Sequence, residues 1–241
     1  MSRDGDLRHH RLMRASWLDD GLSGLIDLLL PLRCAGCDAP GTAWCRACSA
    51  GLGGLRRVER PLLAEPAPPV YALGAYRGPA RRAVLAYKES GRRNLAAPLA
   101  RHLAVGLRAI TAEHRLGRAW WLVPAPSRRI ASRRRGGAHM SRIAHRVAAE
   151  LTRAGWPTSV ADCLVTARGA VDSAGLDAAE RVSNLSGRVL ARTGRFPPPT
   201  AQVALIDDVI TTAATVASCL EVLGTAGVGV AAVLSLTATA G

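Results

Sequence analysis

The chain has 241 residues, of which 49% are hydrophobic, so it can build a real core, and this composition excludes a disordered protein. Its formal net charge of +14 comes almost entirely from arginine, and residues 91–149 alone carry 13 arginines against one acidic residue, Glu113. We therefore expect a polyanion or a phosphorylated substrate as partner, although a high arginine content can also follow from the nucleotide composition of a gene.

The first 17 residues read as a polar tail, too polar for a signal peptide. Residues 17–32 form an amphipathic segment that should end near Pro31. Its apolar part, 22–32, contains Asp27 and is shorter than the roughly 20 residues a membrane span requires. The sequence thus predicts a soluble, cytoplasmic protein without a membrane span, in which the six cysteines are thiols or metal ligands rather than disulfides.

Two Cys-x2-Cys pairs follow, Cys34 with Cys37 and Cys45 with Cys48. Each pair can form a tight turn that directs two thiolates at one ion, so the spacing predicts a tetrahedral Zn2+ site in a small zinc-ribbon module over residues 18–56. A structural zinc would supply the folding energy that so small a module cannot draw from a core. A redox dithiol, or four unrelated thiols, are the alternatives.

The main domain is expected over residues 70–241, after a linker at 56–69 that is rich in proline, leucine and arginine. Apolar periodicity predicts strands at 70–76, 119–124, 159–165, 201–206 and 228–236, and helices at 78–89, 94–113, 138–154 and 214–224. Strands that alternate with helices indicate an α/β fold with a parallel sheet covered on both faces. The irregular interval 166–200 suits a hood or subdomain above that sheet.

An acid-and-hydroxyl cluster follows the apolar run 203–206, with a loop expected at 207–214 and a helix from Thr215. In an open parallel sheet, ligands bind beyond the carboxyl ends of the strands, close to helix N-termini. The carboxylates of Asp207 and Asp208 suit sugar hydroxyls or a hydrated Mg2+, and the threonine hydroxyls and loop N–H groups suit a monophosphate. The cluster could thus bind a ribose 5-phosphate, whereas helix capping would explain only one or two of its residues.

This stretch resembles the 5-phosphoribosyl 1-diphosphate (PRPP) signature of type I phosphoribosyltransferases, a hydrophobic strand followed by Asp-Asp, two hydrophobic residues and Thr-Thr-Gly-x-Thr. The resemblance implies that Asp207 and Asp208 face the ribose 2- and 3-hydroxyls. It implies that the 5-phosphate is wrapped by five consecutive residues: Thr211, Thr212, Ala213, Ala214 and Thr215. The family has glycine where this chain has Ala213, so the methyl group is tolerated if φ is negative and otherwise weakens phosphate binding.

The order of several short motifs over residues 25–238 resembles the ComF family (competence protein F, also called amidophosphoribosyltransferase-like). The motifs are Leu28-Leu-Leu-Pro31, the two cysteine pairs, Leu85-Ala-Tyr-Lys88 with Gly91, Val123-Pro-Ala-Pro126, Arg133-Arg-Arg-Gly136, Leu176, Glu180-Arg-x2-Asn184 and the acidic cluster. The resemblance implies a phosphoribosyltransferase-like fold that binds PRPP with Mg2+. It also implies a part in natural transformation, in which the protein handles incoming single-stranded DNA.

The resemblance further assigns roles to single side chains. Lys88, the only lysine, would face the diphosphate as a compact point charge, and Arg135 would neutralise that leaving group from a mobile lid. In that lid only Arg135 and Gly136 match the family, and Gly137, Ala138 and His139 depart from it. Arg181 and Asn184 would contact the base or acceptor, or form a local salt bridge.

Two functions remain open from the sequence. The first is an enzyme that transfers phosphoribosyl from PRPP to a nitrogen acceptor, with release of diphosphate. The second is a non-catalytic protein of DNA uptake that retains the PRPP pocket. For the second, Trp44, Trp120 and Trp121 are the available stacking residues, and core packing is expected for at least one of the adjacent pair.

Overall fold

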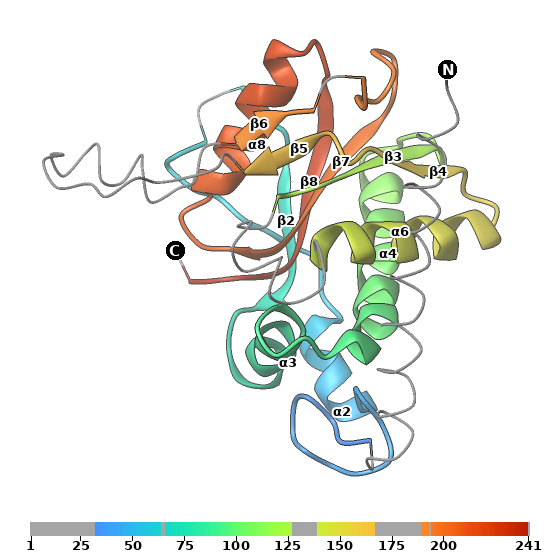
Figure 1. Cartoon of the computed structure of the whole chain (residues 1–241), viewed down its shortest axis with the longest axis vertical. Coiled ribbons are helices and arrows are strands. Elements are labelled where there is room, and N and C mark those ends of the chain that lie inside the picture. The colour runs from blue at the N-terminus through green and yellow to red at the C-terminus, as the bar shows by residue number, and fades with distance from the viewer. Residues whose placement is uncertain (1–31, 64–65, 127–138, 167–188, 193, 241) are drawn as a thin grey trace, which may run out of the picture.

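The computed structural model describes residues 32–63, 66–126, 139–166, 189–192 and 194–240. A six-stranded sheet lies at its centre, in the order β1-β2-β8-β7-β3-β4 (Figure 1). Its strands are β1 (Arg56–Arg57), β2 (Val70–Ala75), β3 (Trp120–Pro124), β4 (Thr158–Val160), β7 (Val203–Ile210) and β8 (Val230–Ala238). All neighbours in the sheet are parallel except β1, which pairs antiparallel with the edge of β2.

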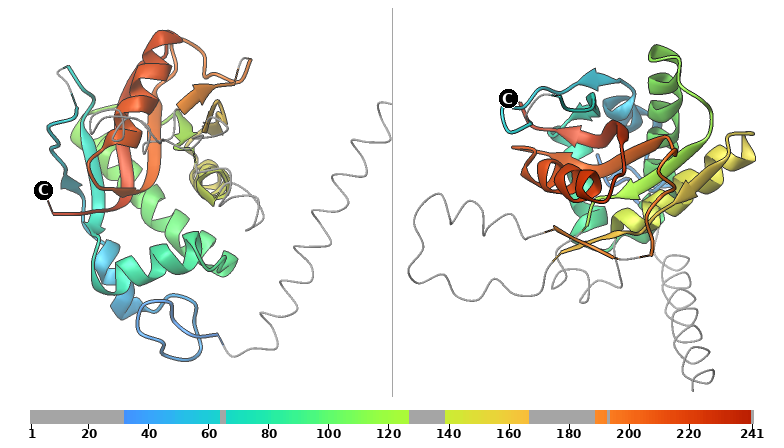
Figure 2. Two further views of the ribbon diagram at one scale, coloured as in Figure 1. Left: turned by 60° about the vertical axis from the view of Figure 1, so that its left-hand side comes forward. Right: turned by 90° about the horizontal axis from the view of Figure 1, so that it is seen from above.

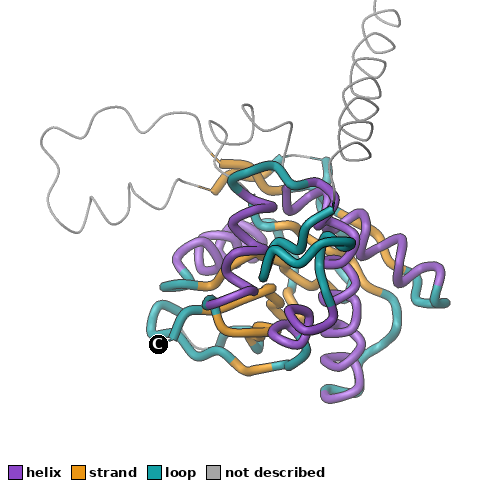
Figure 3. The backbone as a smooth tube through the Cα atoms, turned by 90° about the horizontal axis from the view of Figure 1, so that it is seen from below, coloured by secondary structure: helices purple, strands orange, loops and turns teal. Residues whose placement is uncertain are grey.

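Helices cover both faces of this sheet. They are α3 (Gly78–Lys88), α4 (Ala96–Glu113), α6 (His139–Arg153) and α8 (Ala214–Thr225), with the one-turn helix α2 (Arg46–Ser49) near the cysteines. Figure 2 shows α8 on one side of the sheet and α4 on the other, and Figure 3 shows the helices and loops arranged around the strands. The predicted α/β class, with a mostly parallel sheet between helices, is confirmed.

The alternation of side chains along β7 explains the two layers. Ala204 and Ile206 join the buried cluster that contains α3, α4 and α6, whereas Val203 and Leu205 join the cluster that contains α8. All four side chains are fully buried, as expected for a central parallel strand that carries apolar residues on both faces. The layers therefore follow from a strand period of two in an uninterrupted apolar run.

The predicted strand at 159–165 is two strands. β4 ends at Val160 in the main sheet, and β5 (Leu164–Thr166) pairs antiparallel with β6 (Val189–Ala191) in a separate two-stranded sheet. Ala161 and Cys163 between them are both buried, so the apolar alternation continues while the hydrogen-bonding partner changes. A hydropathy pattern reports burial but not the identity of the neighbouring strand, which is why the prediction merged them.

Some predictions lie outside the described residues. These are the polar tail at 1–17, the amphipathic segment apart from its last residue, and residues 167–188 of the irregular interval. Within the described part of the chain, no helix combines the length and the apolarity that a membrane crossing needs.

Candidate functional site

The four cysteines of the two pairs converge on one point. The sulfur atoms of Cys34, Cys37, Cys45 and Cys48 all lie within 4.8 Å of one another, and the Cys37 and Cys45 sulfurs are 3.7 Å apart. Tetrahedral coordination with metal–sulfur bonds of about 2.3 Å places sulfur atoms about 3.8 Å apart. The cluster is therefore positioned to hold a metal ion, as the spacing predicts.

Backbone amides support negative charge on these sulfurs. The N–H groups of Gly36 and Cys45 each donate to Cys34 Sγ at 3.4 Å, and the Cys48 N–H donates to Cys45 Sγ at 3.5 Å. Burial opposes ionisation of Cys34, but these amide bonds outweigh it and lower its pKa to about 6. A metal-bound thiolate is oriented by the same kind of N–H donor, so the local backbone fits a metal as well as the sulfurs do.

The segment around the four cysteines packs against α3 and α4. Cys34, Trp44 and Cys48 belong to the same buried cluster as the inner faces of α3 and α4. Trp44 Nε1 donates to His102 Nε2 on α4 at 3.2 Å, with the ring nitrogen as acceptor, and Arg82 Nε on α3 donates to the Gly36 carbonyl at 2.6 Å. The module thus completes the core at the end of the two helices.

The two acidic residues lie inside β7 and not in a loop, which corrects the predicted strand end at residue 206. Asp207 pairs in register with Ser235 of β8, and the backbone carbonyl of Asp208 accepts a hydrogen bond from Thr237 Oγ1 at 3.2 Å. Asp207 and Asp208 are 8% and 4% exposed, so two carboxylates are buried at the carboxyl end of a central strand. β8 continues beyond its predicted end to Ala238, and this extension keeps β7 in the sheet.

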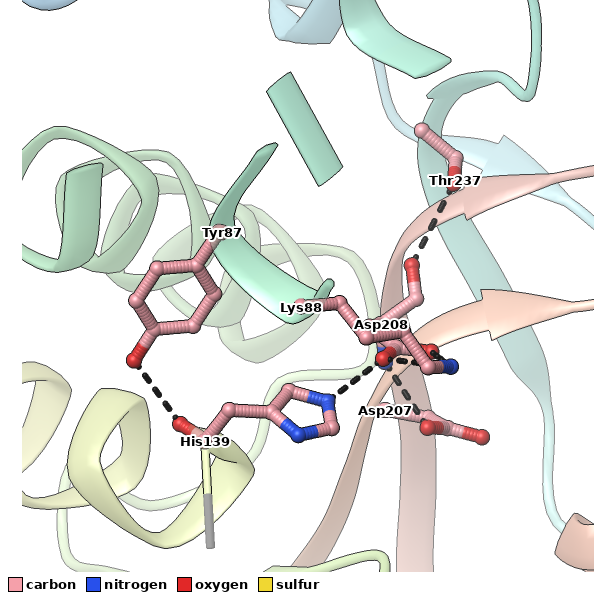
Figure 4. A network of polar contacts seen from close by, with 6 residues as sticks. All are labelled: Tyr87, Lys88, His139, Asp207, Asp208 and Thr237. Carbon is pink, nitrogen blue, oxygen red and sulfur yellow. Dashed lines mark hydrogen bonds and ion pairs between the residues drawn. The ribbon is translucent and has the colours of Figure 1, made fainter. Parts of the chain in front are cut away.

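Lys88 and His139 converge on the carboxylate of Asp208 (Figure 4). Lys88 Nζ, at the last residue of α3, lies 2.9 Å from Asp208 Oδ2 and 3.0 Å from Oδ1. His139 Nε2, at the first residue of α6, lies 2.6 Å from Asp208 Oδ2. The Tyr87 hydroxyl donates to the His139 backbone carbonyl at 2.9 Å and fixes that end of α6.

His139 was missed as a site residue. In the sequence it appears only as a departure from the family lid, and the histidines show no ligand spacing. Its one available signal is its position near the predicted start of a helix, two residues after a glycine pair. The contact with Asp208 joins residues 69 positions apart, so it depends on the tertiary fold.

The surroundings separate the two carboxylates electrostatically. Burial disfavours the charge of Asp208, but the hydrogen bond with His139 and the ammonium of Lys88 outweigh it and lower its pKa. Burial and the charge of Asp208 raise the pKa of Asp207 to about 7. Burial opposes the charge of Lys88 as well, yet Asp208 outweighs it and raises the pKa of the amine. Near neutral pH, Asp208 is ionised while Asp207 can hold a proton.

The segment after β7 has a left-handed residue at its centre. Ala213 has φ 67° and ψ 14°, is 3% exposed, and directly precedes α8. Thr211, Thr212 and Thr215 around it are exposed. The sequence left the sign of φ at Ala213 open, and it is positive. A non-glycine residue in this region costs roughly 1–2 kcal/mol, so the alanine is held in a conformation that glycine would adopt without strain.

Arg60 donates hydrogen bonds to the backbone just after β7 and just after β8. Its Nε donates to the Thr211 carbonyl and its Nη2 donates to the Thr239 carbonyl, both at 2.6 Å. Because Arg60 lies in the region predicted as a linker, it was not expected to have a role. The guanidinium joins the end of β7 to the end of β8 beside the threonines.

The remaining predicted residues are three that lie outside the described residues and three tryptophans. Arg135, Arg181 and Asn184 lie outside the described residues. Trp120 is buried in the core, where its Nε1 donates to Thr111 Oγ1 at 3.0 Å. Trp44 is also buried and Trp121 is half-buried. None of these three rings is an exposed platform for a nucleic-acid base.

No protein-family model matches the chain, and no curated protein matches it. The resemblance to ComF proteins therefore rests on the order and spacing of the motifs.

Proposed function

We propose that the chain binds PRPP with Mg2+ at the carboxyl end of β7, as a phosphoribosyltransferase-like protein of the ComF type. The observation that carries this proposal is the convergence of Lys88 on Asp208 beside the threonine-rich segment before α8. Lys88 lies 120 positions before Asp208 in the sequence, and it meets the acid pair and the nearby start of α8 at the edge where an open parallel sheet binds ligands.

Each of the three groups would bind a different part of PRPP. Asp207 and Asp208 would accept hydrogen bonds from the ribose hydroxyls and hold the Mg2+ that accompanies the diphosphate. The exposed hydroxyls of Thr211, Thr212 and Thr215 would surround the 5-phosphate at the start of α8. Mg2+ would supply charge neutralisation for the leaving diphosphate.

Lys88 would act on the diphosphate. Its side chain is 37% exposed, and its ammonium pairs with Asp208. When a nitrogen nucleophile bonds to ribose C1, the C1–O bond breaks and its electron pair leaves with diphosphate. A cation fixed beside that oxygen stabilises the negative charge as it develops. His139, at the start of α6, would hold the Asp208 carboxylate in place when the Lys88 ammonium moves from Asp208 to the ligand.

We also propose zinc as the metal of the cysteine cluster, in a structural role. Four cysteine thiolates with no open position are typical of structural zinc sites. The cluster packs into the main core, so the bound ion would stabilise the ends of α3 and α4.

Calorimetry with PRPP and Mg2+ tests the pocket, with an Asp207→Asn/Asp208→Asn double variant as control. We expect wild-type binding that the double variant loses. Release of diphosphate on addition of candidate amines then separates the enzyme from the non-catalytic protein of DNA uptake, which would bind without turnover. Absence of PRPP binding to a correctly folded, metal-loaded protein would refute the pocket assignment.

A further inference from the structure

A second basic site lies away from the acid pair, in a groove between α4 and α6. α6 crosses α4 in Figure 1, and the groove where they meet has a volume of about 430 Å3. Four arginines line it, namely Arg101 from α4 and Arg142, Arg146 and Arg153 from α6. The one carboxylate in the lining, Glu150, forms an ion pair with Arg153 at 3.1 Å. The lining therefore has a large positive excess.

Two arginines of this groove differ from several others in the described chain. Arg60 and Arg82 donate to backbone carbonyls, and Arg108 lies over the Trp156 ring at 5.5 Å. Arg101 and Arg146, in contrast, are exposed and form no ion pair with a described residue. The hollow is thus lined by arginines from both helices, and Arg101 and Arg146 among them are exposed.

Helix geometry explains why the charges gather on one side. Arg142 and Arg146 are four positions apart, so they share a face of α6 with Cβ atoms about 5–6 Å apart, an arrangement that disfavours two like charges. Arg153 is two turns further along the same face. A bound anion would relieve this repulsion, and a single phosphate would contact fewer of these groups than a longer ligand would. A ligand with several linked phosphates can engage them together.

The walls between the arginines are mostly small and apolar. Ala97, Ala100 and Ala149 line the groove with His145, whose Nε2 lies 3.1 Å from Asp162 Oδ2, and no phenylalanine, tyrosine or tryptophan lines it. Proteins that bind single-stranded nucleic acid combine a basic groove with aromatic rings for base stacking. The volume is in the range of small-molecule sites. The lining thus favours a compact phosphate chain over a polynucleotide.

We propose that the groove between α4 and α6 binds an oligophosphate, a short chain of phosphoanhydride-linked phosphates, whether inorganic or carried by a nucleotide. The site is independent of the PRPP pocket, although Arg142 lies one turn after His139 on α6. Guanidinium groups from two helices would chelate successive phosphates, and binding would tie α6 to α4.

The test is calorimetry of the zinc-loaded chain with inorganic tripolyphosphate in buffer without Mg2+. We expect binding that weakens steeply with salt and at least tenfold in an Arg101→Gln/Arg146→Gln variant, since each charge-assisted bond is worth about one decade. The matched control is Arg56→Gln/Arg57→Gln, which removes the same charge from exposed positions on β1. Equal weakening in both variants, or no binding by the wild type, overturns the proposal.

Two further arms identify the ligand and separate the sites. If a nucleoside triphosphate binds as tightly as tripolyphosphate, the groove recognises the phosphate chain alone. If the nucleotide binds more tightly and the Arg101→Gln/Arg146→Gln variant loses that binding, the phosphate chain is carried by a nucleotide. Oligothymidylate is tested in the same way. If it binds through Arg101 and Arg146 and tripolyphosphate does not compete with it, the groove is a nucleic-acid surface and the proposal is overturned. The Asp207→Asn/Asp208→Asn variant should lose PRPP and keep tripolyphosphate, so either site can fail without the other.

Discussion

Lys88 and Asp208 are 120 positions apart in the sequence and form an ion pair of 2.9 Å at the carboxyl end of β7. Asp208 is buried, whereas the Lys88 side chain is 37% exposed, and the charge of the amine offsets the burial of the carboxylate. The pair links the C-terminal residue of α3 to the central strand, and it contributes to stability as well as to the proposed site.

Removal of the amine should therefore destabilise the fold. Lys88→Met leaves Asp208 with His139 as its remaining side-chain partner among the described residues, and we expect a loss of about 1–2 kcal/mol in the free energy of unfolding, less than for a fully buried pair. Lys88→Arg keeps the charge and should lose less than half as much. Urea denaturation measures both variants. Equal stability of Lys88→Met and wild type would show that the pair is compensated elsewhere.

The raised pKa of Asp207 predicts a decline in stability with rising pH. The folded pKa is about 7 and the ordinary value is 3.8, so between these values the folded state binds more protons than the unfolded chain. The contribution of Asp207 to the free energy of unfolding is fully present below pH 4. It is lost as the pH rises to 7, by up to about 1.4 kcal/mol per pH unit. Asp208, whose pKa is lowered, contributes in the opposite direction as pH falls.

An Asp207→Asn variant isolates this contribution. Its stability relative to wild type should increase between pH 4 and pH 7 and then level off, as measured by chemical denaturation at a series of pH values. Glu221→Gln, at an exposed carboxylate on α8, controls for the loss of an acidic side chain and should give a flat difference. A flat difference for Asp207→Asn as well would mean that Asp207 ionises normally in the folded protein.

The left-handed Ala213 predicts an unusual response to glycine. Relief of the positive φ is worth roughly 1–2 kcal/mol, while loss of a buried methyl group and greater freedom of the unfolded chain cost about the same together. Ala213→Gly should thus change stability by less than about 0.5 kcal/mol, whereas Ala214→Gly, at a helical residue, should cost about 1 kcal/mol. Ala213→Gly should also bind PRPP more tightly. Thermal denaturation measures the stability of both variants, and calorimetry measures PRPP binding. A larger loss of stability in Ala213→Gly than in Ala214→Gly, or weaker PRPP binding by Ala213→Gly, would contradict the prediction.

The sequence predicts the alternation of helices and strands because buried residues recur with clear periods. The end of β7 was not predictable in this way, since two adjacent carboxylates resemble a loop. They remain in the strand because Ser235 and Thr237 of β8 continue the pairing beside them. The role of His139 depends on where α6 begins relative to β7, and Arg60 acts through backbone carbonyls that no side-chain pattern records.

Metal removal should affect more than the cysteine module. Cys34 and Cys48 are buried with Leu52 against α3 and α4, so loss of the ion should lower the stability of the whole chain. We expect about one zinc per chain by elemental analysis, and its loss in Cys37→Ser/Cys45→Ser. Cys219→Ala, at a buried thiol on α8, should keep the full zinc content. Zinc content that falls equally in both variants would contradict the assignment.

Arg60 should control the order of the threonine segment and not the global fold. Its side chain makes two hydrogen bonds of 2.6 Å to carbonyls at the ends of β7 and β8, and Thr211 and Thr212 beside them are exposed. Arg60→Gln cannot span both carbonyls with the same planar fork, so residues 211–215 should open more often. We expect amide hydrogen exchange there to accelerate about tenfold, which corresponds to the loss of about 1.4 kcal/mol of local stability, with weaker PRPP binding. Arg57→Gln, an exposed arginine on β1, is the matched control and should leave that exchange unchanged. Acceleration spread evenly over the sheet, or none at residues 211–215, would show that Arg60 does not act on this segment.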